Sequence, residues 1–233
     1  MTVAAPAQLD AGVELGADLR HVDTWLFDLD NTLYPVEAGL PNVESKVTDE
    51  VERITGLPRS EAFALQKRYL EEHGLTLRGL MLHHDVDPLA FNALFHDIPM
   101  DGLAEDPELA AGLRRLPGRR LIFTNADDVH TGRVLARLGV ADLFDGVFHI
   151  VSADFFPKPS AESFEKLIAA HAIEPARTAF FEDRAMNLKP AAALGMTTVL
   201  VGSHAAANAD EFVRHRTPRL APFLAAAQVK ERP

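Results

Sequence analysis

Short apolar stretches alternate with helix-spaced apolar positions along most of the chain. The first apolar stretch, residues 24–27, leads directly into acidic residues, which is typical of a buried strand that delivers polar groups at its carboxyl end. Helices should separate the later strands, and this alternation predicts a parallel sheet with right-handed crossovers and helices on both faces. The later strands are expected at residues 120–123, 147–151, 179–181 and 197–201, and the helices at 107–116, 128–138, 160–171 and 187–194.

Residues 38–106 follow a different pattern, because charged residues are interspersed with helix-spaced apolar ones and no strand is predicted. Helices are expected at 43–54 and 60–72. Asp87 followed by Pro88 combines an N-cap with a proline in the first helical position, so a short helix should begin there and run through residue 95. This segment is predicted to be a helical cap inserted after the first strand.

The expected fold is therefore a Rossmann-like α/β core, formed by residues 23–37 and 107–233, that carries the cap of residues 38–106. Residues 1–22 are rich in alanine and have no apolar pattern, so they are predicted to form a flexible lead-in. The tail after His204 is predicted to be helical in pieces.

Charge and composition narrow the classes of partner. The 23 basic and 34 acidic side chains give a net charge of −11, which disfavours nucleic acid polymers and anionic membrane surfaces as partners. The chain has no cysteine, which excludes disulfides, thiolate metal sites and cysteine nucleophiles. The first 20 residues lack the features of a signal peptide and no stretch is long enough to span a membrane, so a cytoplasmic location is expected. Monomer and homodimer both remain open.

Polar residues follow the predicted strands in a suggestive set: Asp28 with Asp30, Thr124 with Asn125, Lys158 with Pro159, and Glu182 with Asp183. In a parallel sheet these groups would lie along the carboxyl edge and face one crevice, where open α/β sheets bind ligands.

Grouped carboxylates repel one another unless a cation is present, and oxygen ligands without cysteine favour Mg²⁺ over Zn²⁺. Lys158 adds a positive charge, and the hydroxyl of Thr124 is suited to bind phosphate oxygens. One carboxylate could attack phosphorus, and another two residues later could exchange protons with the leaving oxygen and with water.

Each element also has an ordinary structural interpretation. Alone, the Asp28–Asp30 pair is more often a turn or a helix cap, Lys158 a solvated lysine before a helix, and Glu182 with Asp183 an acidic helix N-terminus. Their order and common placement after strands make a coincidence improbable.

The motifs resemble those of the haloacid dehalogenase superfamily over residues 24–203. DLDNTLYP at 28–35 resembles its first motif and LIFTN at 121–125 its second, while Lys158-Pro159 and FED at 181–183 are similar to the third and fourth. The dehalogenase branch of the superfamily lacks an acid two residues after the nucleophile, so the acid at residue 30 favours the hydrolysis of phosphate esters.

The resemblance implies a role for each residue. Asp28 would be the nucleophile and a Mg²⁺ ligand, and Asp30 the general acid and base, with its backbone carbonyl on the metal. Lys158 would balance the charge on Asp28 and on the phosphate. Thr124 and Asn125 would bind the phosphoryl group, Asp183 would be a metal ligand, Glu182 a direct or water-mediated one, and Asn187 would orient the site.

A narrower resemblance is to pyrimidine 5′-nucleotidases. It rests on the TLRG run at 76–79, on Thr124-Asn125-Ala126 with His130, and on the DLFDG run at 142–146. It implies hydrolysis of UMP or CMP, with Thr76, Arg78 and His83 or His84 as candidates to contact the base or the ribose. Alternatively, Arg78 pairs with a cap carboxylate, and the run His83-His84-Asp85 belongs to a metal site of another class.

The sequence thus predicts a Mg²⁺-dependent phosphomonoester hydrolase that acts on a small phosphorylated substrate, in first place a pyrimidine nucleoside 5′-monophosphate. A broad sugar-phosphate phosphatase or a phosphomutase is the alternative within the same chemistry. A non-catalytic binding module on the same fold is the alternative from a different class.

Overall fold

A single parallel sheet forms the centre of the molecule. The computed structural model describes residues 16–35, 38 and 42–231, and within them six strands pair in the order β3-β2-β1-β4-β5-β6. Every pairing between neighbouring strands is parallel. The strands are β1 (Thr24–Phe27), β2 (Arg119–Phe123), β3 (Gly146–Phe148), β4 (Thr178–Glu182), β5 (Thr197–Val201) and β6 (His215–Thr217).

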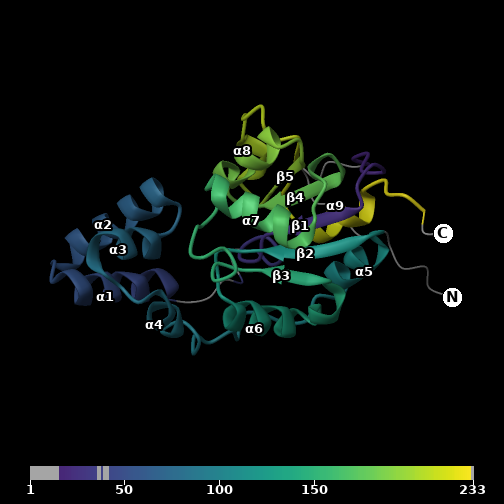
Figure 1. Cartoon of the computed structure of the whole chain (residues 1–233). Coiled ribbons are helices and arrows are strands. Elements are labelled where there is room, and N and C mark those ends of the chain that lie inside the picture. The colour runs from purple at the N-terminus through teal and green to yellow at the C-terminus, as the bar shows by residue number, and fades with distance from the viewer. Residues whose placement is uncertain (1–15, 36–37, 39–41, 232–233) are drawn as a thin grey trace.

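Both faces of the sheet are buried, as expected for parallel strands between helical layers. The side chains of β1 show the alternation: Trp25 and Phe27 belong to one apolar cluster, and Leu26 to the other. The first cluster includes side chains from α5 (Pro107–Arg115), α6 (Asp128–Leu138) and α9 (Leu220–Ala226). The second includes side chains from α7 (Ala161–His171) and α8 (Ala185–Ala193). Figure 1 shows these helices on opposite sides of the strands. The predicted α/β architecture is confirmed.

Four helices lie between β1 and α5 in the chain, and Figure 1 shows them as a separate group beside one end of the sheet. They have their own apolar cluster, which contains Val51, Leu65, Leu80 and Phe91. The helices are α1 (Val43–Thr55), α2 (Arg59–His73), α3 (Thr76–His84) and α4 (Pro88–Ala93). We refer to these four helices and the turns between them as the cap.

The two ends of the described chain lie together against the core. Leu19 and Val22 are fully buried, and Asp18 forms a bridge with Gln228 beside α9. The expectation of a flexible lead-in over residues 1–22 therefore does not hold from Gly16 onward, because these apolar side chains fill a gap in the core. Residues 1–15 lie outside the described residues.

Two strands differ from the sequence-based expectation. β3 ends at Phe148, whereas the apolar run predicted a strand to residue 151; residues 150–155 form turns instead. β6 was not predicted, because an edge strand of three residues with two half-buried polar side chains carries no apolar pattern.

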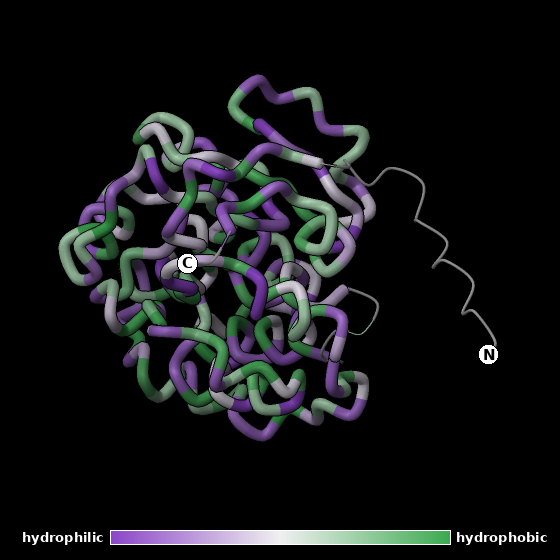
Figure 2. Tube along the Cα trace, turned by 90° about the vertical axis from the view of Figure 1, so that its right-hand side faces the viewer, coloured by the Kyte–Doolittle hydropathy of each residue, from purple (hydrophilic) through white to green (hydrophobic). Residues whose placement is uncertain are grey.

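Hydropathy changes over short distances along the coloured part of the trace in Figure 2, as expected of helices with one buried face. Among the described residues, no helix is long and apolar enough to cross a membrane.

Candidate active site

A cleft of about 740 Å³ lies between the carboxyl edge of the sheet and the cap. Its floor is built by residues that follow strands: Asp28 and Asp30 after β1, Thr124 and Asn125 after β2, and Glu182 and Asp183 at the end of β4. Lys158 reaches the same floor from the loop between β3 and α7. The parallel sheet therefore brings together groups that are distant in sequence.

Lys158 organises the floor. Its ammonium group is buried and donates to Asp28 Oδ1 at 2.6 Å, to Glu182 Oε2 at 2.7 Å and to the Phe123 carbonyl at 2.8 Å. Three donors thus meet three acceptors, which fixes the position of the amine. Burial opposes the charged form, but Asp28 and Glu182 outweigh it and raise the pKa of Lys158, so this residue stays protonated.

Asp28, Glu182 and Asp183 offer oxygen atoms that all lie within 4.8 Å of one another. Burial and the charge of Glu182 raise the pKa of Asp28 to about 7, despite Lys158. Burial and Asp183 raise the pKa of Glu182 to about 7, and burial and Asp28 raise that of Asp183 to about 6. The single ammonium of Lys158 therefore does not compensate the charge of the three buried carboxyl groups.

The charge and the donor set fit a divalent cation. Three carboxylates and the Lys158 ammonium leave a net charge of −2 when all are ionised. Asn187 Oδ1 is also buried at the cleft, without a hydrogen-bond partner among the described residues. An unsatisfied buried acceptor costs about 1–3 kcal/mol, and a bound water would satisfy it. Hard oxygen ligands of this kind suit Mg²⁺.

Asp30 is held from two sides. Its Oδ1 accepts from the Tyr34 hydroxyl at 2.5 Å and from His130 Nε2 at 2.8 Å. Burial disfavours charge on both partners of the ion pair, but the hydrogen bond and the attraction between them outweigh it. The pKa of Asp30 is lowered and that of His130 is raised.

The loop after β2 carries two polar side chains, Thr124 and Asn125, which make different hydrogen bonds. The buried Thr124 hydroxyl accepts from the Ala126 backbone amide at 3.0 Å, so its own proton is left to donate into the cleft. Asn125 binds the backbone of Lys158 at both ends of its amide: Oδ1 accepts from the Lys158 amide at 2.8 Å, and Nδ2 donates to the Lys158 carbonyl at 3.2 Å. Asn125 thus holds the loop that carries the lysine.

The cap side of the cleft is mostly apolar. Two carboxamides and the ion pair of Glu44 with Lys67 interrupt this wall. Gln66 is hydrogen-bonded at one end to the Thr48 hydroxyl at 2.6 Å, and Asn92 Nδ2 is buried without a partner among the described residues. The apolar lining comes from Val43, Val47, Leu70, Leu75, Leu77, Phe91, Phe95 and Ile98.

Of the cap residues predicted to contact the substrate, one lines the cleft and the others do not. Thr76 lines the cleft, but its hydroxyl donates to the Gln66 carbonyl at 3.1 Å. Arg78 does not line the cleft; its guanidinium lies over the Phe156 ring, 4.6 Å from the centroid. His83 stacks on Tyr69 and is also outside the cleft lining, and His84 is hydrogen-bonded to the Tyr69 hydroxyl.

Those histidines form no metal cluster with other acidic or histidine ligands in the part of the chain that the structure describes. The only such group there is Asp28 with Glu182 and Asp183. The alternative interpretation of His83-His84-Asp85 as a metal site is therefore not supported.

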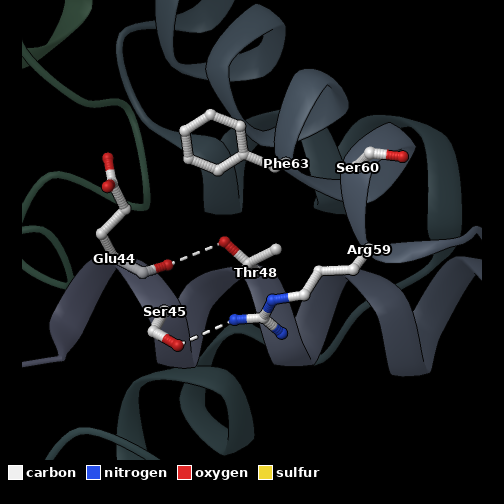
Figure 3. Close-up of a pocket in the computed structure, with 6 residues that line it drawn as sticks. All are labelled: Glu44, Ser45, Thr48, Arg59, Ser60 and Phe63. Atoms are coloured by element: carbon white, nitrogen blue, oxygen red, sulfur yellow. Dashed lines mark hydrogen bonds between the residues drawn. The ribbon is translucent and has the colours of Figure 1, made fainter.

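A second hollow of about 520 Å³ lies between α1 and α2. In Figure 3 the Arg59 guanidinium is joined to Ser45, and the Thr48 hydroxyl to the Glu44 carbonyl. Arg59 also pairs with Asp49, so its charge is satisfied within the cap. We place no site there.

Several residues of the site were not predicted from the sequence. Tyr34 lies four residues after Asp30, a spacing that could have suggested their contact. Gln66, Asn92 and Gly74 gave no local signal, since only the packing of the cap on the core brings them to the cleft.

Comparison with known proteins gives a consistent result. The sequence profile described as haloacid dehalogenase-like hydrolase matches residues 22–195. The chain is 28% identical over 193 residues to Phosphate metabolism protein 8 of Saccharomyces cerevisiae. The match covers 76% of this chain and 60% of the yeast protein, so the chain spans less than two thirds of the length of that relative.

Solved structures share the fold. L-2-haloacid dehalogenase from Xanthobacter autotrophicus, with chloropropionic acid covalently bound, matches with a TM-score of 0.56 at 16% identity, over 88% of this chain and 97% of that one. A phosphatase from Thermococcus onnurineus matches with a TM-score of 0.56 at 20% identity, over 85% and 94%. A putative hydrolase from Bacillus subtilis, solved with bound magnesium, matches with a TM-score of 0.55 at 15% identity, over 86% and 95%.

Proposed function

Since the chain belongs to the haloacid dehalogenase-like hydrolases, we propose that it hydrolyses phosphate monoesters with Mg²⁺ through an aspartyl phosphate on Asp28. The observation that carries this proposal is the grouping of Asp28 with Lys158, Glu182 and Asp183 around one point of the cleft floor, with Asp30 beside them. This group offers a nucleophile, a fixed ammonium, oxygen ligands for a cation and a second carboxyl for proton transfer.

The phosphatase rather than the dehalogenase reaction is supported by Asp30. An alkoxide needs a proton when it leaves phosphorus, and a carboxyl group two residues from the nucleophile can supply it, whereas a halide leaves without one. The names of the relatives point both ways, since one is a dehalogenase and another a phosphatase.

The proposed reaction has two steps. Asp30 takes up a proton when the phosphate anion binds beside it, because the added negative charge disfavours its ionised form. A carboxylate oxygen of Asp28 then attacks phosphorus, the bond to the ester oxygen breaks, and Asp30 gives that proton to the ester oxygen. Water then attacks phosphorus and loses a proton to Asp30, and the bond to Asp28 breaks to release phosphate. Lys158 offsets the negative charge on the nucleophile throughout, and Thr124 donates its hydroxyl hydrogen to a phosphoryl oxygen.

Mg²⁺ would be held by Asp28 and Asp183, and when bound it would neutralise the charge of the phosphoryl group. Both Glu182 oxygens are already engaged: Oε2 accepts from Lys158, and Oε1 accepts from the Arg184 amide at 3.1 Å. This supports contact between Glu182 and the metal through water rather than directly.

A pyrimidine nucleoside 5′-monophosphate is the substrate that we favour. The apolar cap wall with two carboxamides suits a flat base with polar edges, whereas a sugar phosphate needs polar groups around the whole ring. Of the residues predicted to read the base, Thr76 lines the cleft; Arg78 and His83 do not, so we base recognition on Gln66 and Asn92.

Phosphate release from a substrate panel tests the proposal. The panel contains UMP, CMP, dTMP, AMP, GMP and several sugar phosphates, with Mg²⁺ at neutral pH and the Asp28→Asn variant as the blank. A preference for UMP and CMP supports the nucleotidase assignment. A flat profile or a peak on a sugar phosphate would leave the chemistry intact and refute the substrate, and an isomeric phosphate as product would indicate a mutase. No turnover on any ester would refute the phosphatase and favour a binding module.

A further inference from the structure

His130 is a residue of the cleft to which the proposed reaction assigns no role. It lines the cleft from the first turn of α6, and its side chain is 12% exposed. Its Nε2 donates to Asp30 Oδ1, an atom that also accepts from the Tyr34 hydroxyl. The two partners come from different elements, so they hold the Asp30 carboxyl group from two directions.

The rest of α6 keeps this histidine in place. Asp127 caps the helix, and its Oδ1 accepts from the His130 amide at 2.9 Å. The other Asp127 oxygen is bound to His96 at 2.6 Å, on the segment that leads back from the cap. Arg133, one turn further along, donates to the Ile98 carbonyl at 2.8 Å. The start of α6 is therefore tied to neighbouring segments, and the imidazole has little freedom to move.

The two oxygens of Asp30 are consequently not equivalent. Oδ1 has two donors, while Oδ2 has no hydrogen-bond partner among the described residues, and Asp30 faces the cleft. We infer that His130 is a positioning residue which, with Tyr34, occupies Oδ1 and leaves Oδ2 to exchange the proton with the leaving oxygen and the attacking water. This inference rests on the proposed function, because it assigns Asp30 its part in ester hydrolysis.

The need of the leaving group for a proton provides a way to test this assignment. In the first step the ester O–P bond breaks, the Asp28 O–P bond forms, and the proton of Asp30 Oδ2 moves to the leaving oxygen. A nitrophenolate leaves without that proton, but an alkoxide requires it. A misplaced Asp30 should therefore slow the cleavage of an alkyl phosphate much more than that of 4-nitrophenyl phosphate.

The experiment compares kcat/KM for these two esters in the wild type and in His130→Ala, His130→Gln and Tyr34→Phe. The quotient kcat/KM reports the steps up to cleavage of the ester. For His130→Ala we expect a loss of roughly 10- to 100-fold on the alkyl phosphate and less than about 5-fold on the aryl phosphate. His130→Gln keeps a donor of similar reach and should recover most of the loss, and Tyr34→Phe should show the same selectivity.

His21→Ala is the matched control. His21 is exposed and bonds Thr197 at 2.9 Å at the opposite edge of the sheet, so this variant should change neither rate. Equal losses on both esters for His130→Ala and Tyr34→Phe, in variants whose melting curves match the wild type, would overturn the inference and leave the phosphatase assignment standing. So would unchanged rates in both variants. A wild type that cleaves neither ester would refute the proposed function, and the inference with it.

Discussion

Gly74 of the cap packs on the backbone carbonyl of Lys158 so closely that a Cβ at residue 74 would lie 2.5 Å from that oxygen. Gly74 ends α2 with a φ of 78°, in the left-handed region that favours glycine. The turn of the cap thus rests on the loop that carries Lys158, and this contact is made through the backbone.

We expect Gly74→Ala to lower kcat/KM roughly 10- to 100-fold, because the added Cβ must displace either the cap or the Lys158 loop. Gly56→Ala is the matched control: it also ends a cap helix with a φ of 70°, but a Cβ there would meet nothing within 4 Å. Both variants should lose about 1–2 kcal/mol from the left-handed backbone. Steady-state rates and melting curves of the two variants separate the effects, and equal activities would contradict the role of the contact.

Asp28→Asn should abolish turnover, since an amide cannot form the acyl phosphate. The residual rate of phosphate release should lie below about a hundredth of the wild-type rate. Removing one of three raised-pKa carboxylates also relieves repulsion, so this variant should melt higher than the wild type in the absence of metal. An active Asp28→Asn enzyme would assign the nucleophile to another residue.

The raised carboxyl pKa values predict how metal-free stability depends on pH. In the unfolded chain these carboxyls lose their protons near pH 4, but in the folded protein Asp183 does so near 6, and Asp28 and Glu182 near 7. Between these limits the folded state binds more protons than the unfolded state. The free energy of unfolding must therefore fall as the pH rises from about 4 to 7.

Mg²⁺ should restore the free energy of unfolding that is lost as the pH rises, because the cation takes the place of the protons on the carboxyl groups. We expect the rise in melting temperature on adding Mg²⁺ to the chelator-treated protein to be larger at pH 8 than at pH 5. Asp183→Asn should reduce that rise at pH 8. Thermal melts at the two pH values with and without Mg²⁺ provide the measurement, and a rise that is the same at both would argue against a metal at these carboxylates.

The sequence was informative wherever a strand delivers its side chains directly to the cleft. Asp28 and Glu182 meet because β1 and β4 are parallel neighbours, and the apolar runs before them already predicted those strands. The contact of His130 with Asp30 could not be predicted in this way, since it depends on the docking of α6 rather than on the pairing of strands.

The cap shows most clearly which features of the site could not be predicted from the sequence. The motif around Thr76 and Arg78 pointed to substrate recognition, but α3 was not predicted, and the face that a helix turns to the cleft is decided by its packing. Arg78 consequently lies over Phe156, while Gln66, with no motif of its own, lines the cleft.

The different positions of Gln66 and Arg78 relative to the cleft lead to the last prediction. Gln66→Met keeps the length of the side chain and removes its hydrogen-bonding groups, so the loss of one bond to the base should lower kcat/KM for UMP about 5- to 10-fold. The rate with 4-nitrophenyl phosphate, which has no such base, should change less than about 2-fold. Arg78→Ala is the control from outside the cleft, and it should leave the ratio of the two rates unchanged. If Arg78→Ala changes the ratio and Gln66→Met does not, the cap recognises its substrate in a different arrangement, in which α3 turns its arginine toward the base.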